Sequence, residues 1–325
     1  MPIADSPVLL SAEDVAKYYP LPGGLFGATR RTVRAVDGVS FSIRQGETFG
    51  LVGESGCGKS TLCRAVARLE SGVGGRIIFK GQEILTLPPS EMRPLRRDIQ
   101  MVFQDPKASL HPLQRVREAL AEPFRIHGVA HGKALQQQVT DLLRRVGLRA
   151  EHGDRLPKQL SGGQRQLVCI ARAIALRPKL VIFDEPVSSL DASVQSQILN
   201  LLQDLQQDLG LACLFVSHNL NVVDYLCDTI AVMYLGKIVE IAPKAELAQN
   251  PLHPYTQALL ASVLKVEHKG RKTGPGISGE MPSAANPPPG CRFHTRCLFA
   301  FDRCRVEEPA LQDKGQGHLV SCHLY

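Results

Sequence analysis

The chain has 325 residues, 44% of them hydrophobic, which is enough to bury the core of one large domain or of two domains. Its 38 basic and 31 acidic residues give a net charge of +7, which suits contact with phosphates, nucleic acid or an anionic membrane face. No apolar run approaches the roughly 20 residues that span a bilayer, and the N-terminal residues lack the pattern of a signal peptide. We therefore expect a cytoplasmic chain that meets a membrane only through a partner.

The first 52 residues predict β structure. Residues 8–20 have the pattern of an edge strand that ends in Tyr18, Tyr19 and a proline. Apolar and polar residues then alternate from 33 to 52, with glycine turn signals between the runs, which favours short antiparallel strands. The last of these runs is apolar throughout and leads directly into a glycine-rich loop.

The glycine-rich loop reads GESGCGKST and fits the pattern G-x-x-x-x-G-K-[ST] between a predicted strand and a predicted helix. Its glycines allow backbone N–H groups to turn inward and bind an anion, helped by the positive end of the following helix. Lys59 provides a charge for β- and γ-phosphates, and the Ser60 hydroxyl suits Mg²⁺. The alternative is a plain strand-to-helix turn, which the flanking elements disfavour. The expected nucleotide-binding residues of the loop are Gly53, Glu54, Ser55, Gly56, Cys57, Gly58, Lys59, Ser60 and Thr61.

Helices dominate the segment after the loop. A helix is expected over residues 59–69, where a glycine cluster ends it. Residues 114–151 are rich in Leu, Ala, Gln, Arg and Glu and predict further helices with an amphipathic face. These helices interrupt the alternation of strands and helices, so we expect a helical subdomain at about residues 105–175.

The catalytic candidates stand where apolar strands end. A strand predicted at 180–183 leads into Asp184, the expected Mg²⁺ ligand, and Glu185, which is suited to polarise the attacking water. The next apolar strand ends beside His218, which is placed to contact a γ-phosphate, and Gln104 ends an earlier strand, where it can reach metal or water or simply cap a turn. Unbroken apolar strands that alternate with helices indicate a mainly parallel sheet, whose carboxyl edge binds ligands.

The composition changes after about residue 250. A last helix is expected at 255–264, then a basic linker at 265–276 and a cysteine-rich tail. Five of the nine cysteines are scattered among apolar segments, and four crowd the tail with the spacing C-x5-C-x6-C-x17-C. In a reducing compartment this clustering favours metal over disulfides, and four thiolates can hold zinc or a [4Fe–4S] cluster. The tail cysteines are Cys291, Cys297, Cys304 and Cys322, with His294, His318 and His323 as weaker alternative ligands.

These motifs occur in the order seen in ATP-binding-cassette ATPases, which the chain resembles over about residues 8–245. The motifs are the loop at 53–60, VFQDP around Gln104, LSGGQ at 160–164, LVIFDEP at 180–186, SSLD at 188–191 and SH at 217–218. The resemblance implies an α/β P-loop NTPase with a mostly parallel core sheet, an antiparallel β subdomain and a helical subdomain. It implies ATP hydrolysis by Glu185, His218 and Gln104, with Mg²⁺ held by Ser60, Gln104 and Asp184.

The same resemblance implies a dimer in which two subunits sandwich two ATP molecules. Ser161, Gly163 and Gln164 would contact the nucleotide held by the opposite subunit's loop, and Asp191 would cross the interface.

Three other positions follow from this resemblance. Tyr19 is similar to the aromatic residue that stacks on adenine, with Tyr18 as the runner-up. Gln104 would link the nucleotide state to membrane subunits that dock near the helical subdomain. Asn219 replaces the aspartate that commonly follows the histidine, a departure that removes no catalytic group.

The tail resembles that of the ATPase subunits of dipeptide and oligopeptide permeases. NPLHPYTQALL, SGEMPS and NPPPGCRFHTRC carry this likeness. It implies a nucleotide-binding domain at 1–250, an extension at 251–325 whose cysteines hold a [4Fe–4S] cluster with zinc as the alternative, and attachment to the cytoplasmic face of a bacterial inner membrane. The implied partners are a second ATPase subunit in a heterodimer, two membrane-spanning permease subunits and an extracytoplasmic solute-binding protein.

Other functions stay open at this stage. Nickel, glutathione and related uptake systems share the tail, so the solute need not be a peptide. A soluble cassette ATPase acting on nucleic acid would fit the positive charge, but the chain shows one cassette and no sustained heptads, so we expect no nucleic-acid partner. A metal-sensing regulator that binds nucleotide only structurally would have no need of Glu185 and His218.

Overall fold

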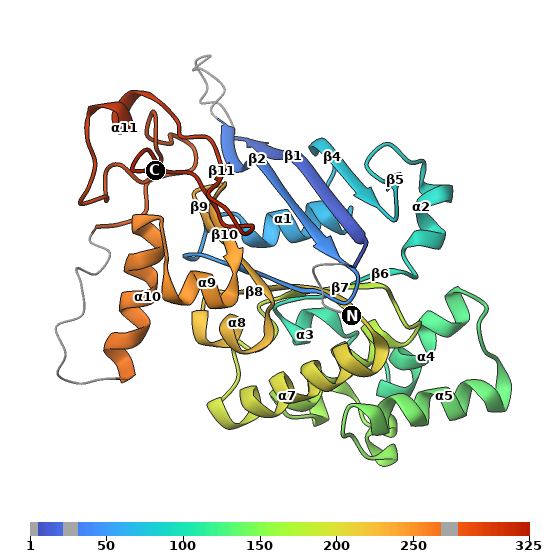
Figure 1. Ribbon diagram of the computed structural model, residues 1–325. Helices are drawn as coiled ribbons and strands as arrows, with labels where there is room; N and C mark the ends of the chain where they lie inside the picture. Colours follow the sequence, from blue (N-terminus) through green and yellow to red (C-terminus); the bar gives the residue numbers. More distant parts are fainter. Residues whose placement is uncertain (1–5, 22–31, 268–278) are drawn as a thin grey trace. The chain divides into compact units, whose positions relative to one another are not determined.

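The computed structural model describes residues 6–21, 32–267 and 279–325 (Figure 1). It divides into two compact units, which are described separately. The first contains the described residues of 6–7, 44–46 and 87–215, and the second contains the described residues of 8–43, 47–86 and 216–325. No helix in the described ranges is both long enough and apolar enough to cross a membrane.

The first unit combines a parallel strand pair with a group of helices. Strands β6 (Ile99–Val102) and β7 (Leu180–Asp184) pair in parallel, with Ile99 opposite Leu180. All five residues of β7 are buried, as its apolar sequence predicts. Strand β8 (Ala212–Ser217) is also buried throughout, and its residues up to Phe215 belong to this unit.

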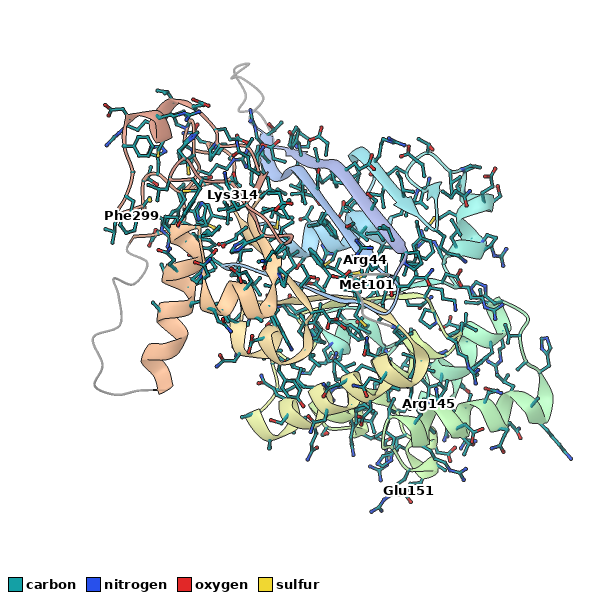
Figure 2. The ribbon with its side chains drawn as sticks, in the orientation of Figure 1. Arg44, Met101, Arg145, Glu151, Phe299 and Lys314 are labelled. Carbon is teal, nitrogen blue, oxygen red and sulfur yellow. The ribbon has the colours of Figure 1, made fainter. Side chains whose placement is uncertain are left out.

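The helices of the first unit follow the expected amphipathic pattern. Helices α4 (Val116–Ile126), α5 (Gly132–Arg145) and α6 (Gly162–Ile174) contact one another through their apolar faces, and α6 also contacts α7 (Ala192–Leu209). Arg145 and Glu151 project from this group into solvent (Figure 2). The remaining elements are α2 (Pro89–Leu95), α3 (Pro106–Ser109) and the 3-10 turns η2 (Ala150–Asp154) and η3 (Pro157–Gln159).

The second unit contains an antiparallel sheet in the order β2-β1-β4-β5. Strands β1 (Val8–Pro20) and β4 (Gly74–Phe79) pair with Leu10 opposite Phe79, and they are flanked by β2 (Thr32–Arg44) and β5 (Gln82–Glu83). This sheet confirms an antiparallel β region, but the short strands predicted from residue 33 onward form one strand of 13 residues, β2, and β1 lies inside the sheet and not at its predicted edge.

The second unit also contains strands in the order β11-β12-β10-β9-β3. Strand β3 (Thr48–Val52) pairs in parallel with β9 (Thr229–Tyr234), which forms the predicted hairpin with β10 (Lys237–Pro243). Strands β12 (Leu319–Val320) and β11 (Gln312–Asp313) then continue the order antiparallel. This second group of strands is therefore mixed, because the parallel pair β3/β9 accompanies antiparallel pairs.

Within the described ranges, five helices complete the second unit. They are α1 (Lys59–Val66), α8 (Leu220–Leu226), α9 (Lys244–Gln249), α10 (Pro254–Glu267) and α11 (Asp302–Val306). Helix α1 ends three residues before the predicted end at Leu69, because Arg68 has a left-handed backbone with φ of 52°. Helix α10 continues through residue 267, so the start of the predicted linker at 265–276 is helical, and the rest of that linker lies outside the described residues.

Candidate nucleotide site

The phosphate loop, defined as Gly53–Ser60, joins the buried strand β3 to helix α1 in the second unit. Gly58 has a φ of 111°, and a Cβ built there would lie 2.0 Å from the carbonyl oxygen of Ala35. Only glycine fits this position, because both the backbone angle and the close approach exclude a side chain. The Gly236 amide donates to the Cys57 carbonyl at 2.8 Å, which ties the loop to the turn between β9 and β10.

Lys59 is held inside the phosphate loop. Its side chain is buried, and its ammonium group donates to the carbonyl oxygens of Gly53 at 2.8 Å and Glu54 at 2.9 Å. These bonds hold the positive charge against the backbone of the loop, where a phosphate-binding lysine is expected. Burial raises the pKa of the neighbouring Cys57 thiol, although Lys59 opposes that shift.

Tyr19, the predicted adenine-stacking residue, belongs to the same unit as the loop. The Lys17 ammonium lies 4.8 Å from the centre of its ring. The pKa of the Tyr19 hydroxyl is raised mainly by burial, and hydrogen bonding to Thr61 opposes that shift. Tyr18 points its hydroxyl elsewhere, since it donates to Asp37. Tyr19 is therefore the tyrosine that lies beside the phosphate loop.

The predicted catalytic carboxylates lie in the first unit at the end of β7. Asp184 is the last residue of the strand and is 2% exposed. Glu185 follows with a φ of 47°, an unfavourable left-handed conformation for a residue with a side chain. The Nε2 of Gln104 donates to the Glu185 carboxylate at 3.2 Å. The fold thus brings together two side chains that the sequence separates by 81 positions.

The LSGGQ motif begins helix α6 of the first unit. The Ser161 hydroxyl accepts a hydrogen bond from the Gln164 amide at 3.2 Å, and the Gln164 side chain accepts one from the Ser161 amide at 3.0 Å. This capping box leaves the start of α6 well ordered. A Cβ on Gly163 would lie 2.6 Å from Val194 of α7, so the motif packs closely against that helix. Asp191 is the exposed N-cap residue of α7.

His218 follows β8 and is exposed, in the second unit. Asn219, beside it, caps α8 by accepting a hydrogen bond from the Asn221 amide at 3.0 Å. Asparagine is among the best N-cap residues, which gives a structural reason for its presence here. The predicted residues therefore belong to two groups, one in each unit.

The four tail cysteines lie in the second unit, close enough to influence one another's pKa. The pKa of Cys291 is raised to about 11, mainly by burial and to a smaller extent by the charges of Cys322, Cys304 and Cys297. Three of the thiols each accept a hydrogen bond from the backbone N–H of the residue two positions later; they are those of Cys291, Cys297 and Cys322. Within the described ranges, no three His, Cys, Asp or Glu side chains are arranged to hold a metal ion. The structure thus has the predicted donors near one another, but not the predicted metal geometry.

The histidines proposed as weaker ligands have other partners. The Nδ1 of His294 lies 2.8 Å from the Cys291 carbonyl, and the Nε2 of His323 lies 2.9 Å from the Glu307 carbonyl. His318 is buried against Glu240, with 2.7 Å between its Nε2 and the carboxylate.

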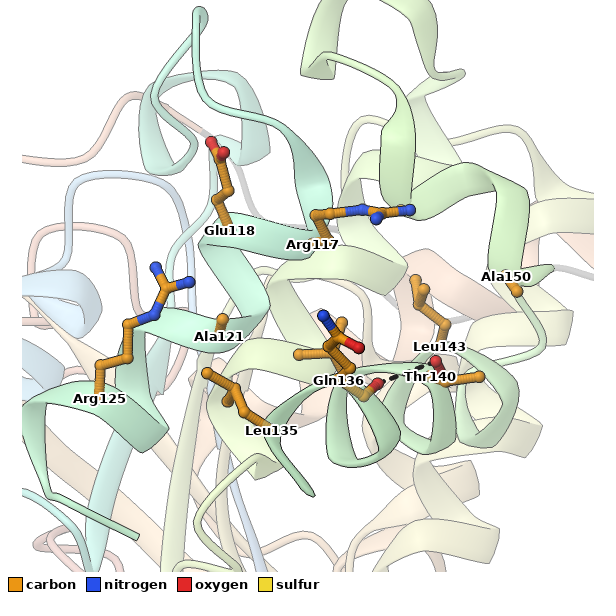
Figure 3. Close-up of a pocket in the computed structure, with 11 residues that line it drawn as sticks. Arg117, Glu118, Ala121, Arg125, Leu135, Gln136, Thr140, Leu143 and Ala150 are labelled. Carbon is orange, nitrogen blue, oxygen red and sulfur yellow. Dashed lines mark hydrogen bonds between the residues drawn. The ribbon is translucent and has the colours of Figure 1, made fainter. Parts of the chain in front are cut away.

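A feature that the sequence analysis missed is a cavity of about 430 Å³ in the first unit (Figure 3). Helices α4 and α5 supply most of its wall, including Arg117 and Arg125 on one side and Leu135 and Thr140 on the other. No sequence motif marks it, because its lining combines ordinary amphipathic positions of two helices with residues of η2.

Comparison with known proteins fits this arrangement. The chain matches the family model "ABC transporter" over residues 36–188 and the model "Oligopeptide/dipeptide transporter, C-terminal region" over residues 239–304. A dimeric ATP-binding cassette solved in a post-hydrolysis state with ADP and Pi aligns with a TM-score of 0.65 and 27% identity, covering 73% of this chain and 99% of its own. The fold and its motifs are those of an ABC ATPase.

Relatives define the family more narrowly. The oligopeptide transport ATP-binding protein AppF of Bacillus subtilis is 48% identical over 100% of both chains. The dipeptide transport ATP-binding protein DppF of Escherichia coli is 46% identical over 97% of this chain and 93% of its own. The glutathione import ATP-binding protein GsiA of Escherichia coli is 50% identical over 98% of this chain but 49% of its own length. The chain belongs to the ATP-binding subunits of the oligopeptide and dipeptide ABC transporter family, whose members hydrolyse ATP to power transport.

Proposed function

We propose that the chain is the ATP-hydrolysing subunit of a bacterial importer for dipeptides or oligopeptides, bound peripherally to the cytoplasmic face of the inner membrane. The observation that carries this proposal is the hydrogen bond between Gln104 and Glu185 directly after the buried Asp184. It gives the chain a carboxylate that is held in place to act as a general base. The full-length likeness to two peptide transport subunits supports the cargo.

In this proposal the residues around ATP have distinct tasks. The loop amides and Lys59 bind the phosphates, and Tyr19 stacks on adenine. Ser60, Asp184 and Gln104 would hold Mg²⁺, which would neutralise charge on the phosphates. Glu185 orients the attacking water, and His218 contacts the γ-phosphate. The loop residues assigned to nucleotide binding remain Gly53, Glu54, Ser55, Gly56, Cys57, Gly58, Lys59, Ser60 and Thr61.

The other half of each ATP site comes from a second subunit. Ser161, Gly163 and Gln164 would face the nucleotide of the opposite loop, with Asp191 at the interface. The dimeric cassette structures support a dimer of ATPase subunits. We propose that the partner is a second, different ATPase subunit. ATP binding would close the dimer, and hydrolysis would reopen it.

The transport partners are two membrane-spanning permease subunits and an extracytoplasmic solute-binding protein. Gln104 would report the nucleotide state to the permeases, which dock near the helical subdomain at about 105–175. The cavity between α4 and α5 supports this surface, since helices of a partner fit grooves between helices. The chain would act as a nucleotide-binding domain at 1–250 with an extension at 251–325.

The decisive experiment is Glu185→Gln in the assembled transporter. Loss of the general base predicts stable ATP binding with turnover reduced by about 100-fold or more. Glu151→Gln, a change at an exposed position of the same unit, serves as the matched control. ATPase rate and retained nucleotide are measured together. Near-normal hydrolysis in Glu185→Gln would remove this residue as the base.

Cys291, Cys297, Cys304 and Cys322 would hold a [4Fe–4S] cluster, with zinc as the alternative. Four nearby thiols and backbone N–H groups directed at three of them support a cluster, because such hydrogen bonds tune cluster thiolates. Metal analysis and visible absorption of protein purified without oxygen test this. About four irons per chain and a colour lost in Cys297→Ser support the cluster; one colourless zinc supports the alternative, and no metal contradicts both.

A second cargo class has a specific observation in its favour. GsiA, a glutathione import protein, is 50% identical to nearly all of this chain. Transport assays that compare a dipeptide with glutathione, in cells carrying the cognate permeases, decide between them. Nickel is the third candidate cargo, and the same transport assay tests it.

A further inference from the structure

Three contacts in the second unit join the C-terminal extension, residues 251–325, to the phosphate loop. The Arg296 guanidinium forms a two-pronged ion pair with the Glu54 carboxylate, at 3.0 and 3.2 Å. The Tyr255 hydroxyl accepts a hydrogen bond from the Glu54 amide at 3.0 Å. Met281 lies over the loop tip, since a Cβ built on Gly56 would be 3.5 Å from its Cε. The extension therefore contacts the Glu54 side chain, the Glu54 backbone amide and the tip of the loop at Gly56.

Arg296 is held rigidly where it meets Glu54. Its side chain is 6% exposed, and its guanidinium carbon lies 5.7 Å from the centre of the Tyr234 ring. The ring of Tyr234 in turn packs against those of Tyr255 and Phe293, at 4.7 and 5.3 Å between centres. The Arg296 amide donates to the Phe293 carbonyl at 2.9 Å. A planar guanidinium fixed in this way loses little freedom when it pairs with a carboxylate.

The position of Glu54 gives this ion pair a consequence for nucleotide binding. Glu54 is the second residue of a loop that is expected to hold a highly negative triphosphate, and its side chain is 29% exposed. An unpaired carboxylate there would repel the phosphates, because like charges in a partly buried site interact strongly. Arg296 cancels that charge, and Tyr255 fixes the Glu54 amide that borders the anion site.

We propose that Arg296 and Tyr255 are positioning residues of the ATP site, so that the extension sets the affinity of the phosphate loop for nucleotide. This rests on the proposed role of residues 53–61. Neither residue belongs to the nucleotide motifs, and neither needs to touch ATP. The extension acts by neutralising Glu54 and by holding its backbone.

The same contact connects the loop to the cysteines. Arg296 lies directly before Cys297, in a turn that begins at Cys291, whose amide donates to the Cys304 carbonyl at 2.9 Å. Any change that disorders this turn, such as loss of a group bound by the cysteines, releases Arg296 from Glu54. ATP affinity then depends on whether the cysteine segment is ordered.

The test is a double-mutant cycle in the full-length chain, with Mg²⁺ and the fluorescent nucleotide MANT-ATP as the probe. Arg296→Ala is expected to weaken binding about tenfold, and Glu54→Gln in the same chain is expected to restore most of the loss. Arg303→Ala is the matched control, because Arg303 pairs with the exposed Glu307 of the same extension. Equal losses in the single and double variants would show a merely structural role and overturn the proposal.

Milder variants keep the test valid if Arg296→Ala folds poorly. Tyr255→Phe keeps the ring packing but removes the acceptor of the Glu54 amide, and about threefold weaker binding is expected. Arg296→Lys keeps the charge and should recover part of the loss seen with alanine. Unchanged binding in Tyr255→Phe together with normal binding in Arg296→Ala would contradict the proposal.

Two further variants distinguish a failure of this inference from a failure of the proposed phosphate-binding and cysteine sites. Lys59→Ala tests the phosphate loop itself, so binding that survives this change would refute the site and not only the role of Arg296. Cys297→Ser is expected to weaken binding in the parent chain but to add nothing to Arg296→Ala. Additive losses in that pair would refute the connection between the cysteine turn and the loop.

Discussion

The phosphate loop and the C-terminal extension reach their structures in opposite ways. The loop is determined by local backbone geometry, since Gly58 at φ 111° and the following helix create the anion site within a few residues. The extension is held by long-range pairs of side chains. Arg292 meets Asp37 across 255 positions, and Arg296 meets Glu54 across 242. A local motif can be recognised in a sequence, whereas a pair so far apart cannot.

The largest expected effect comes from breaking the local region. Gly58→Ala places a Cβ only 2.0 Å from the Ala35 carbonyl oxygen and forces a left-handed backbone on alanine. We expect nucleotide binding to be lost, as measured by MANT-ATP titration. Gly46→Ala is the control, because Gly46 has a φ of 74° but no atom within 4 Å of its Cβ. If both variants bind nucleotide equally, steric fit is not what makes Gly58 essential.

The second effect tests the long-range region. Arg292 is buried, and it donates hydrogen bonds to Asp37 and to the Leu235 carbonyl. Burial alone would raise the pKa of Asp37, but hydrogen bonds from Tyr18 and Arg292 outweigh it and hold that pKa below its usual value. Arg292→Ala removes the nearest cation of a nearly buried carboxylate and leaves the more distant Arg34, 3.8 Å away, so we expect the free energy of unfolding to fall by about 3 kcal/mol.

Urea unfolding measures this loss, with Arg303→Ala as the exposed control. Because the folded-state pKa of Asp37 is depressed, its contribution is present above the ordinary carboxyl pKa and disappears as the pH falls through the lower, folded value. The difference between parent and Arg292→Ala should therefore shrink in strong acid. A difference that does not change with pH would mean that packing, and not charge, holds the extension.

The comparison also shows why the sequence predicted some parts and not others. The apolar run of β7 and the acidic pair after it predicted the edge where Gln104 and Glu185 meet. Strands β11 and β12 were missed, because two-residue strands have no alternation to detect. The early end of α1 was missed because nothing in the sequence marks Arg68 as left-handed. The anchors of the extension depend on charges that look like ordinary surface residues until the fold pairs them.

The smallest expected effect is a pH dependence of stability that arises at His253, where the extension begins. His253 caps α10, since its Nδ1 accepts a hydrogen bond from the Tyr255 amide at 3.0 Å, and its burial lowers its pKa to about 3. An unfolded histidine takes up a proton below its ordinary pKa of about 6.5 while the buried one stays neutral, so stability falls as the pH drops from there towards 3. At pH 5 the expected loss is about 2 kcal/mol relative to pH 7.

His253→Asn isolates this effect, because asparagine can also cap the helix but does not titrate. Urea unfolding at pH 5 and pH 7 should show a smaller pH difference in His253→Asn than in the parent chain. The extension and the phosphate loop meet at Tyr255, two residues on, so MANT-ATP affinity at pH 5 should fall with stability in the parent and less in the variant. If the MANT-ATP affinity of the parent chain stays constant while its stability falls, the helix of the extension and the phosphate loop unfold independently.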